Sequence, residues 1–164
     1  MKALRLFLCA LVGALAVTGV AQADGSSDDD GGCRTVKANG VGQDLGGGNT
    51  IATITQGGIL NGTTAAHFDI NGGAFPTFTF AGTVTFTTKR GTLAVAISGT
   101  FNVATGDFAA SGPITGGTGR FAGATGTLTF AGNENLQTGT FTETVQGTIC
   151  LADADDEDDE DDDD

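Results

Sequence analysis

Large hydrophobic and small polar residues alternate along much of the chain between residues 33 and 150. In the segment TFTFAGTVTFT (77–87), threonines hold most odd positions and large apolar residues hold even ones, at Phe78, Phe80, Val84 and Phe86. The segment TLAVAISGTF (92–101) likewise places Leu93, Val95 and Ile97 on one face. A period of two in β-branched and aromatic residues is typical of strands that bury one face.

Turn-forming residues separate these segments and divide the region into eight predicted strands. The predicted strands cover residues 33–38, 49–57, 59–70, 76–88, 92–102, 107–114, 125–132 and 139–150. Short connections make neighbouring strands antiparallel. An even number of strands, each with one apolar face, favours closure, because closure removes exposed sheet edges. We therefore predict an all-β fold, an eight-stranded antiparallel β-barrel, with a two-sheet sandwich as the alternative.

The glycine-rich segment ITGGTGRFAGATG (114–126) is open to a different interpretation. Its residues 117–122 fit the G-x-G-x-x-A pattern of a dinucleotide-binding turn. Such a turn needs a helix after it, so that the phosphate meets the N-terminus of that helix. The alternating residues TLTF (127–130) follow instead and predict a strand. The segment is therefore predicted to form a corner between two strands.

The same segment, together with GTFNVATGDF (99–108), resembles the allene oxide cyclase and dirigent barrel superfamily. The family loop, of the type G-G-T-G-x-F-x-x-A-x-G with Arg120 at its first variable position, is matched by Gly116, Gly117, Thr118, Gly119, Phe121, Ala124 and Gly126. The resemblance covers most of residues 50–150 and implies an eight-stranded barrel with a central cavity, often assembled as a homotrimer. Plant members cyclise an unstable fatty-acid epoxide or steer the coupling of phenoxy radicals. Bacterial secreted relatives mostly have no assigned activity, and only the structural loop aligns here.

The two ends of the chain differ from the alternating region. Residues 1–23 combine the basic Lys2 and Arg5, an apolar run and a small-x-small pattern ending at Ala23, which is typical of a cleaved signal peptide. We predict a secreted or periplasmic protein without a membrane anchor once cleaved, and an uncleaved anchor is the alternative.

Residues 24–32 are predicted to be an acidic flexible linker, residues 33–152 the barrel, and residues 153–164 a disordered acidic tail.

The net charge of −13 lies in these ends, because residues 33–152 contain five acidic and five basic residues. A neutral barrel with acidic ends argues against nucleic acid as a partner. The acidic ends would attract calcium weakly, although Asp24, Ser26 and Asp28 lack the rest of an EF-hand pattern. No cofactor and no built metal site are predicted.

Export also determines how the cysteines are interpreted. Cys9 leaves with the signal peptide, so that Cys33 and Cys150 remain in the mature chain. Two cysteines in an oxidising compartment predict a disulfide. The alternative, a zinc site, lacks ligands, because two thiols and the single His67 do not complete a tetrahedral shell.

Glu143 is the candidate catalytic residue. In TFTETVQGTI (140–149) it shares its parity with Phe141 and Val145, so its carboxyl group is expected to face an apolar interior. Desolvation there would raise the pKa of the carboxyl and suit it to acid–base chemistry. The alternative is a bulge, or a position at the rim where an arginine pairs with Glu143. The phenylalanines predicted to line the cavity are Phe78, Phe80, Phe86, Phe101, Phe130 and Phe141.

Two other polar positions carry weaker signals. Arg120 is expected to close the glycine-rich corner by bonding backbone carbonyls, with a carboxylate anchor at the barrel mouth as the alternative. His67 shares parity with Asp69 and is expected to face solvent; a hydrolase triad with Ser98 or Ser111 would need a nucleophile elbow that the sequence lacks.

Three functions remain open on the sequence. The first is binding of a small apolar ligand in the cavity without turnover. The second is an isomerase or cyclase that uses Glu143, and the third is a surface or matrix scaffold whose acidic tail attracts cations. An open, dry cavity with one carboxyl of raised pKa would favour the second, an open cavity without one would favour the first, and a barrel filled by its own phenylalanines would favour the third.

Overall fold

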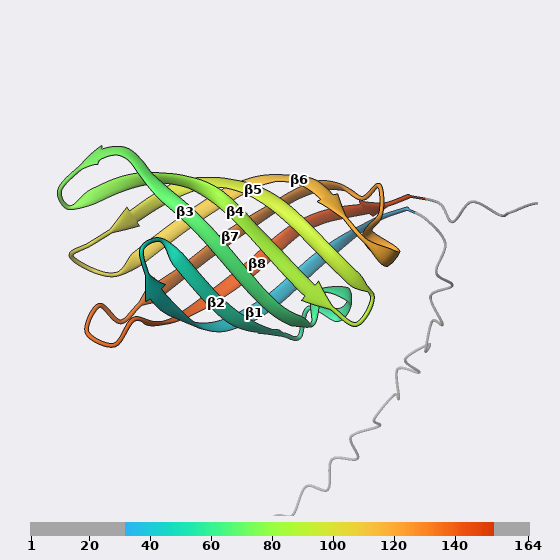
Figure 1. Ribbon diagram of the computed structural model, residues 1–164, viewed down its shortest axis with the longest axis horizontal. Helices are drawn as coiled ribbons and strands as arrows, with labels where there is room; N and C mark the ends of the chain where they lie inside the picture. Colours follow the sequence, from blue (N-terminus) through green and yellow to red (C-terminus); the bar gives the residue numbers. More distant parts are fainter. Residues whose placement is uncertain (1–31, 153–164) are drawn as a thin grey trace, which may run out of the picture.

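The computed structural model describes residues 32–152, which form a closed β-barrel (Figure 1). Eight antiparallel strands follow one another around the barrel in chain order. The strands are β1 (Gly32–Gly46), β2 (Asn49–Thr55), β3 (Gly62–Ala74), β4 (Thr77–Thr88), β5 (Gly91–Asn102), β6 (Asp107–Gly117), β7 (Thr125–Glu134) and β8 (Thr140–Leu151). The predicted all-β barrel is confirmed, and the sandwich alternative is not formed.

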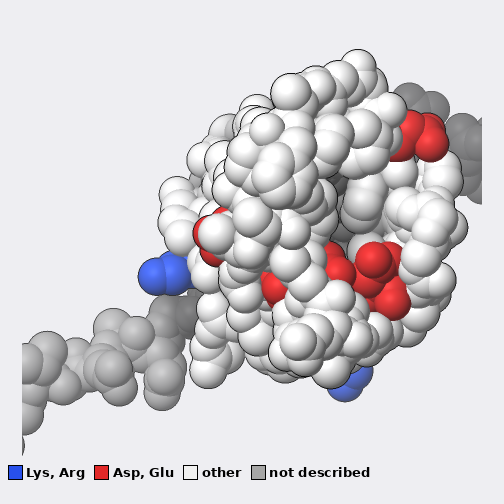
Figure 2. Space-filling view, turned by 90° about the vertical axis from the view of Figure 1, so that its left-hand side faces the viewer, with Lys and Arg blue, Asp and Glu red and all other residues white. Residues whose placement is uncertain are grey.

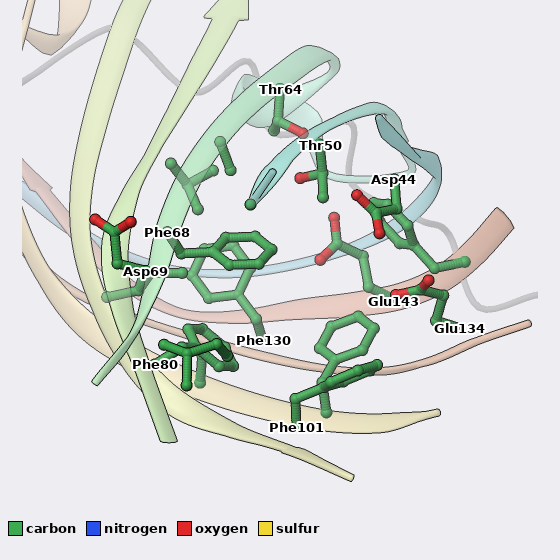
Figure 3. A pocket seen from close by; sticks show the side chains of 18 of the residues that line it. Asp44, Thr50, Thr64, Phe68, Asp69, Phe80, Phe101, Phe130, Glu134 and Glu143 are labelled. Carbon is green, nitrogen blue, oxygen red and sulfur yellow. The ribbon is translucent and has the colours of Figure 1, made fainter. Parts of the chain in front are cut away.

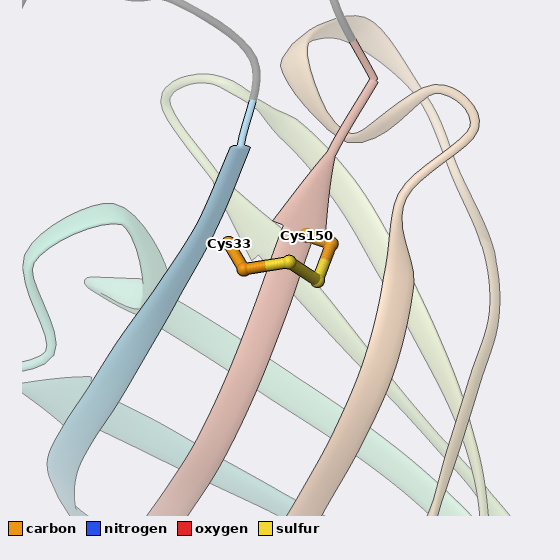
Figure 4. Close-up of a disulfide and its surroundings, with 2 residues drawn as sticks. All are labelled: Cys33 and Cys150. Atoms are coloured by element: carbon orange, nitrogen blue, oxygen red, sulfur yellow. A yellow bond between two sulfur atoms is a disulfide. The ribbon is translucent and has the colours of Figure 1, made fainter.

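The barrel is closed by the pairing of its first and last strands. In the described part of the chain, β1 and β8 pair without a break from Gly32 opposite Leu151 to Gln43 opposite Thr140. Cys33 and Cys150 are directly opposite in this ladder and form a disulfide (Figure 4). The predicted disulfide is confirmed, and it is compatible with an extracellular or periplasmic location. The predicted signal peptide, with its cleavage after Ala23, lies outside the described residues.

The first strand is longer than the sequence indicated. The predicted strand ended at residue 38, whereas β1 continues to Gly46. Gly40 and Gly42 hold the inward positions of this extension, where the alternation would otherwise place apolar side chains. A Cβ at Gly42 would collide with the ring of Phe141 and the backbone oxygen of Ile51. The glycines therefore continue the strand and leave the interior space to side chains of β8.

The two ends of the barrel differ. At one end, which we call the closed end, β1 begins, β8 ends, and two single-turn 3₁₀ helices connect strands: η1 (Gly58–Leu60) and η2 (Gly119–Phe121). Each helix places one side chain with no exposed surface against the core, Leu60 from η1 and Phe121 from η2. At the opposite end, which we call the mouth, the β1–β2, β3–β4, β5–β6 and β7–β8 connections surround the interior without such plugs.

The glycine-rich segment forms the predicted corner between two strands. Residues 118–124 turn from β6 to β7 through η2, and the amide of Arg120 donates a hydrogen bond to the carbonyl of Arg90 at 2.9 Å. Only the three-residue η2 follows the glycines, so the helix N-terminus of a dinucleotide site is not formed. Within residues 32–152, no helix is long and apolar enough to cross a membrane.

Candidate functional site

A cavity of about 370 Å³ occupies the mouth half of the barrel. Its wall is largely apolar, and the apolar residues that border it are Ala66, Phe68, Ile70, Phe80, Val84, Ile97, Phe101, Phe108, Ala110, Phe130 and Phe141. The side chains that add polar groups are Asp44, Thr50, Thr64, Asp69, Glu134 and Glu143 (Figure 3). A concave apolar wall with a few polar groups is typical of a small-molecule site.

Strand alternation supplies most of this wall, as the sequence predicted. Of the six predicted phenylalanines, Phe80, Phe101, Phe130 and Phe141 border the cavity. Phe86 is fully buried below it, with its ring centroid 6.2 Å from that of Phe130. Phe86 therefore belongs to the packed floor of the barrel rather than to the cavity wall.

Phe78 is half-buried near the β3–β4 connection, opposite Phe101, and does not border the cavity. Two other rings that the prediction omitted do border it, Phe68 and Phe108. The ring of Phe68 lies 5.1 Å from that of Phe80, and the ring of Phe108 meets Phe141 edge to face at 5.9 Å. Both residues have the inward parity of their strands, so the alternation alone would have identified them.

Glu143 projects into the cavity from β8, as predicted. The β8 ladders to β1 and β7 show no register shift, so no bulge turns the residue outward. Its direct neighbours across both ladders are glycines, Gly40 on β1 and Gly132 on β7. The side chain lies over Gly40, where an added Cβ would be only 2.6 Å from Cγ of Glu143. These glycines provide the room that an inward carboxyl group needs.

Burial raises the pKa of Glu143 from 4.5 to about 7. The cause is desolvation, because an apolar wall stabilises the charged carboxylate less well than water does. Within residues 32–152, no arginine forms an ion pair with Glu143, so the alternative in which an arginine pairs with it is not found there. Glu143 is therefore a carboxyl group that titrates near neutral pH and faces the cavity.

Asp44 and Glu134 add two more carboxyl groups on the strands beside Glu143. Asp44 is near the end of β1, and Glu134, the last residue of β7, pairs with Phe141. The pKa of Glu134 is raised, first by desolvation and second by the negative charge of Asp44. Figure 3 shows the three carboxyl groups on one side of the cavity. They form what we call the carboxyl rim: Asp44, Glu134 and Glu143.

Charged residues are segregated along the barrel axis, which the sequence analysis did not foresee. The five basic residues of the described chain are at or near the closed end: Arg34, Lys37, Lys89, Arg90 and Arg120. The five acidic residues are toward the mouth: Asp44, Asp69, Asp107, Glu134 and Glu143. Figure 2 shows carboxylates around the hollow at the mouth. A barrel with no net charge therefore presents a negative end and a positive end.

The remaining candidate residues are outside the cavity. Arg120 is in η2 at the closed end, so it does not anchor a carboxylate at the mouth. His67 faces solvent, with 59% of its side chain exposed, and its Nδ1 is 3.0 Å from Oδ1 of Asn49. Ser98 and Ser111 pair with each other across β5 and β6, with β4 between them and His67 on β3. No hydrolase triad is assembled from these residues.

The structure adds no metal centre to this picture. Within residues 32–152, no group of three or more His, Cys, Asp or Glu side chains is arranged to hold a metal ion. The acidic segments for which weak calcium binding is predicted, residues 24–30 and 153–164, lie outside the described residues.

Comparisons with known proteins leave the site to be interpreted from its own chemistry. A scan against protein-family models found no match to this chain, and a search of curated proteins found none either.

Proposed function

We propose that this protein binds a small, largely apolar molecule in the cavity at the mouth of the barrel. The observation that carries the proposal is the cavity of about 370 Å³, bordered mainly by aromatic and aliphatic side chains. Closed cores are packed without voids of this size, because an empty apolar cavity forfeits dispersion contacts. Ligand binding would restore those contacts, and the space argues against a barrel that serves only as a filled scaffold.

Native mass spectrometry of the purified protein tests this function directly. We expect a small-molecule adduct that is released on collisional activation, and the same spectra give the number of subunits. Titration with decanol, followed by calorimetry, tests the cavity when no ligand co-purifies. The proposal is overturned when neither an adduct nor decanol binding is detected.

Neighbouring alanines on β6 provide a matched pair of variants for the same test. Ala110 faces the cavity and is 8% exposed, whereas Ala109, the residue before it, is exposed on the outside. Ala110→Leu fills part of the cavity and should abolish decanol binding. Ala109→Leu adds the same atoms outside the barrel and should leave binding unchanged. Equal affinities in the two variants would place the decanol site elsewhere.

An isomerase or cyclase is the second candidate, favoured by Glu143. A carboxyl group with a pKa of about 7 in an apolar cavity can accept and return a proton near neutral pH. Its raised pKa meets one part of the condition stated above for this function, and binding in the cavity is a step that both candidates share, so binding is proposed first. The methyl ester of an unsaturated fatty-acid epoxide, which carries no charged carboxylate, is the appropriate probe, and Glu143→Gln should remove any excess of cyclised over hydrolysed product. Equal product ratios with wild type and Glu143→Gln would eliminate this candidate.

Membership of the allene oxide cyclase and dirigent superfamily and export from the cell remain part of the proposal. The eight-stranded barrel and the corner at residues 118–124 support the first. The disulfide supports the second. The subunit count from native mass spectrometry tests the homotrimer that the resemblance implies.

A further inference from the structure

We infer that the ligand of this cavity is an amphipathic organic cation, with an apolar body among the phenylalanines and a protonated amine or guanidinium group at the carboxyl rim. This inference rests on the proposed binding function and specifies the chemical class of the ligand.

The polar groups of the cavity fit a positive head group. Asp44, Glu134 and Glu143 are on three adjacent strands and border one side of the cavity. No lysine, arginine or histidine borders the cavity in the described part of the chain. A ligand carboxylate would therefore meet like charges, whereas an ammonium group would donate charge-assisted hydrogen bonds to the carboxylates.

The position of Glu143 makes a neutral ligand a poorer match. A wholly apolar molecule in the cavity would displace the remaining water from the Glu143 carboxyl, and Gly40 and Gly132 beside it offer no side-chain donor. A buried polar group without a partner is costly. An ammonium group would restore a partner to the carboxyl, and the phenyl rings beneath it would add cation–π attraction.

The segregation of charge along the barrel also favours a cationic ligand while the ligand is still approaching the mouth. All five acidic residues of the described chain are toward the mouth, and the five basic residues are at or near the opposite end. Such a distribution attracts cations to the mouth, and in the bound state it favours a positive group at the mouth over one near the basic closed end. The attraction acts over about 8 Å at physiological salt, which is the Debye length.

Three probes with one apolar chain test the inference: decylammonium, decanol and decanoate, titrated calorimetrically at pH 8. We expect decylammonium to bind about tenfold or more tightly than decanol, and decanoate to bind most weakly. Glu143→Gln should reduce the preference for the amine, and Asp44→Asn combined with Glu134→Gln should reduce it further. Circular dichroism of each variant checks that the barrel is formed.

Asp107→Asn is the matched control, because it removes a carboxylate from the same end of the barrel. Asp107 accepts hydrogen bonds from Thr105 and Asn133 and does not border the cavity. This variant should keep the full preference for decylammonium.

The outcomes separate this inference from the function on which it rests. Binding of decanol as tightly as decylammonium would overturn the cationic class and leave the binding function in place. A preference for the amine that survives removal of all three rim carboxylates would also overturn it. Failure of all three probes to bind would overturn the binding function itself.

Discussion

Glu143 on β8 lies directly opposite Gly40 on β1, and its side chain occupies the space that a side chain at Gly40 would fill. A Cβ at Gly40 would be 2.6 Å from Cγ of Glu143 and 2.7 Å from its Oε1. The inward position of the Glu143 carboxyl group therefore depends on a glycine at position 40. The acid is held against an apolar wall because its neighbour contributes only backbone.

Replacing Gly40 with alanine should displace the Glu143 carboxyl and lower its pKa from about 7 toward 4.5. The physical reason is that a displaced carboxyl regains contact with water, which stabilises its charged form. Carboxyl-detected NMR titration measures the pKa directly. Gly116→Ala is the control, because an added Cβ there meets nothing within 4 Å. An unchanged Glu143 pKa in Gly40→Ala would contradict the arrangement.

The stability of the barrel should depend on pH through Glu143. Because its folded-state pKa is raised, the group contributes stability that is fully present below about 4.5 and lost as the pH rises through about 7. The glutamine of Glu143→Gln cannot ionise, so the variant does not lose this stability. Between pH 4 and pH 8, the free energy of unfolding of the variant should therefore rise by about 3 kcal/mol relative to that of the wild type. Urea denaturation at both pH values measures this difference.

Two other carboxyl groups lie beside Glu143 in that experiment. Asp44 faces it from β1 and Glu134 from β7, while Gly40 and Gly132 directly opposite carry no charge. Both acids are present in the wild type and the variant, so the comparison isolates Glu143. Parallel pH profiles of the two proteins would show that the carboxyl is solvated in the folded state.

Asp44→Asn should lower the pKa of Glu134. The raised pKa of Glu134 comes first from desolvation and second from the charge of Asp44, so the variant removes only the second cause. The shift should be partial and larger at low ionic strength, because salt screens the interaction. NMR titration of the Glu134 carboxyl in both proteins measures it. Asp107→Asn should leave the pKa of Glu134 unchanged. An equal decrease of this pKa in Asp107→Asn would indicate an effect of the net charge of the protein rather than of Asp44.

Removing the disulfide should destabilise the barrel without changing its topology. The bridge joins residues 117 apart, and closing so long a loop in the unfolded chain corresponds to about 4–5 kcal/mol in the chain-entropy model. The double variant Cys33→Ser, Cys150→Ser should show a lower free energy of unfolding with an unchanged circular dichroism spectrum. Equal stability of the wild type under oxidising and reducing conditions would argue against this contribution.

The alternation of residues predicted the barrel but not the extent of every strand. Phe80, Phe130 and Val145 follow a simple period of two, and that period reveals which face is buried. Gly40 and Gly42 interrupt it, because their role is to accommodate side chains of another strand. A single strand does not reveal the identity of its neighbour across a ladder. The end of β1 was therefore missed, while Glu143 was found from its own parity.

The separation of charges was present in the sequence, but it becomes visible only through topology. Lys89 and Asp107 are separated by 18 positions, and Arg90 is the one charged residue between them, so the linear sequence shows no trend. In a barrel of consecutive antiparallel strands, alternate connections lie at opposite ends, which assigns Lys89 to the closed end and Asp107 to the mouth. The charges of residues 33–152 sum to zero, and a sum along the sequence carries no information about which end of the barrel each charge occupies.

The bridge between Cys33 and Cys150 also has a mechanical consequence. It joins the first strand to the last at the end where both flanking segments attach. A pulling force applied between those segments would pass from one sulfur to the other and leave the intervening chain without load. A molecule tethered at both ends would keep its internal chamber undistorted under tension, facing away from the tethers.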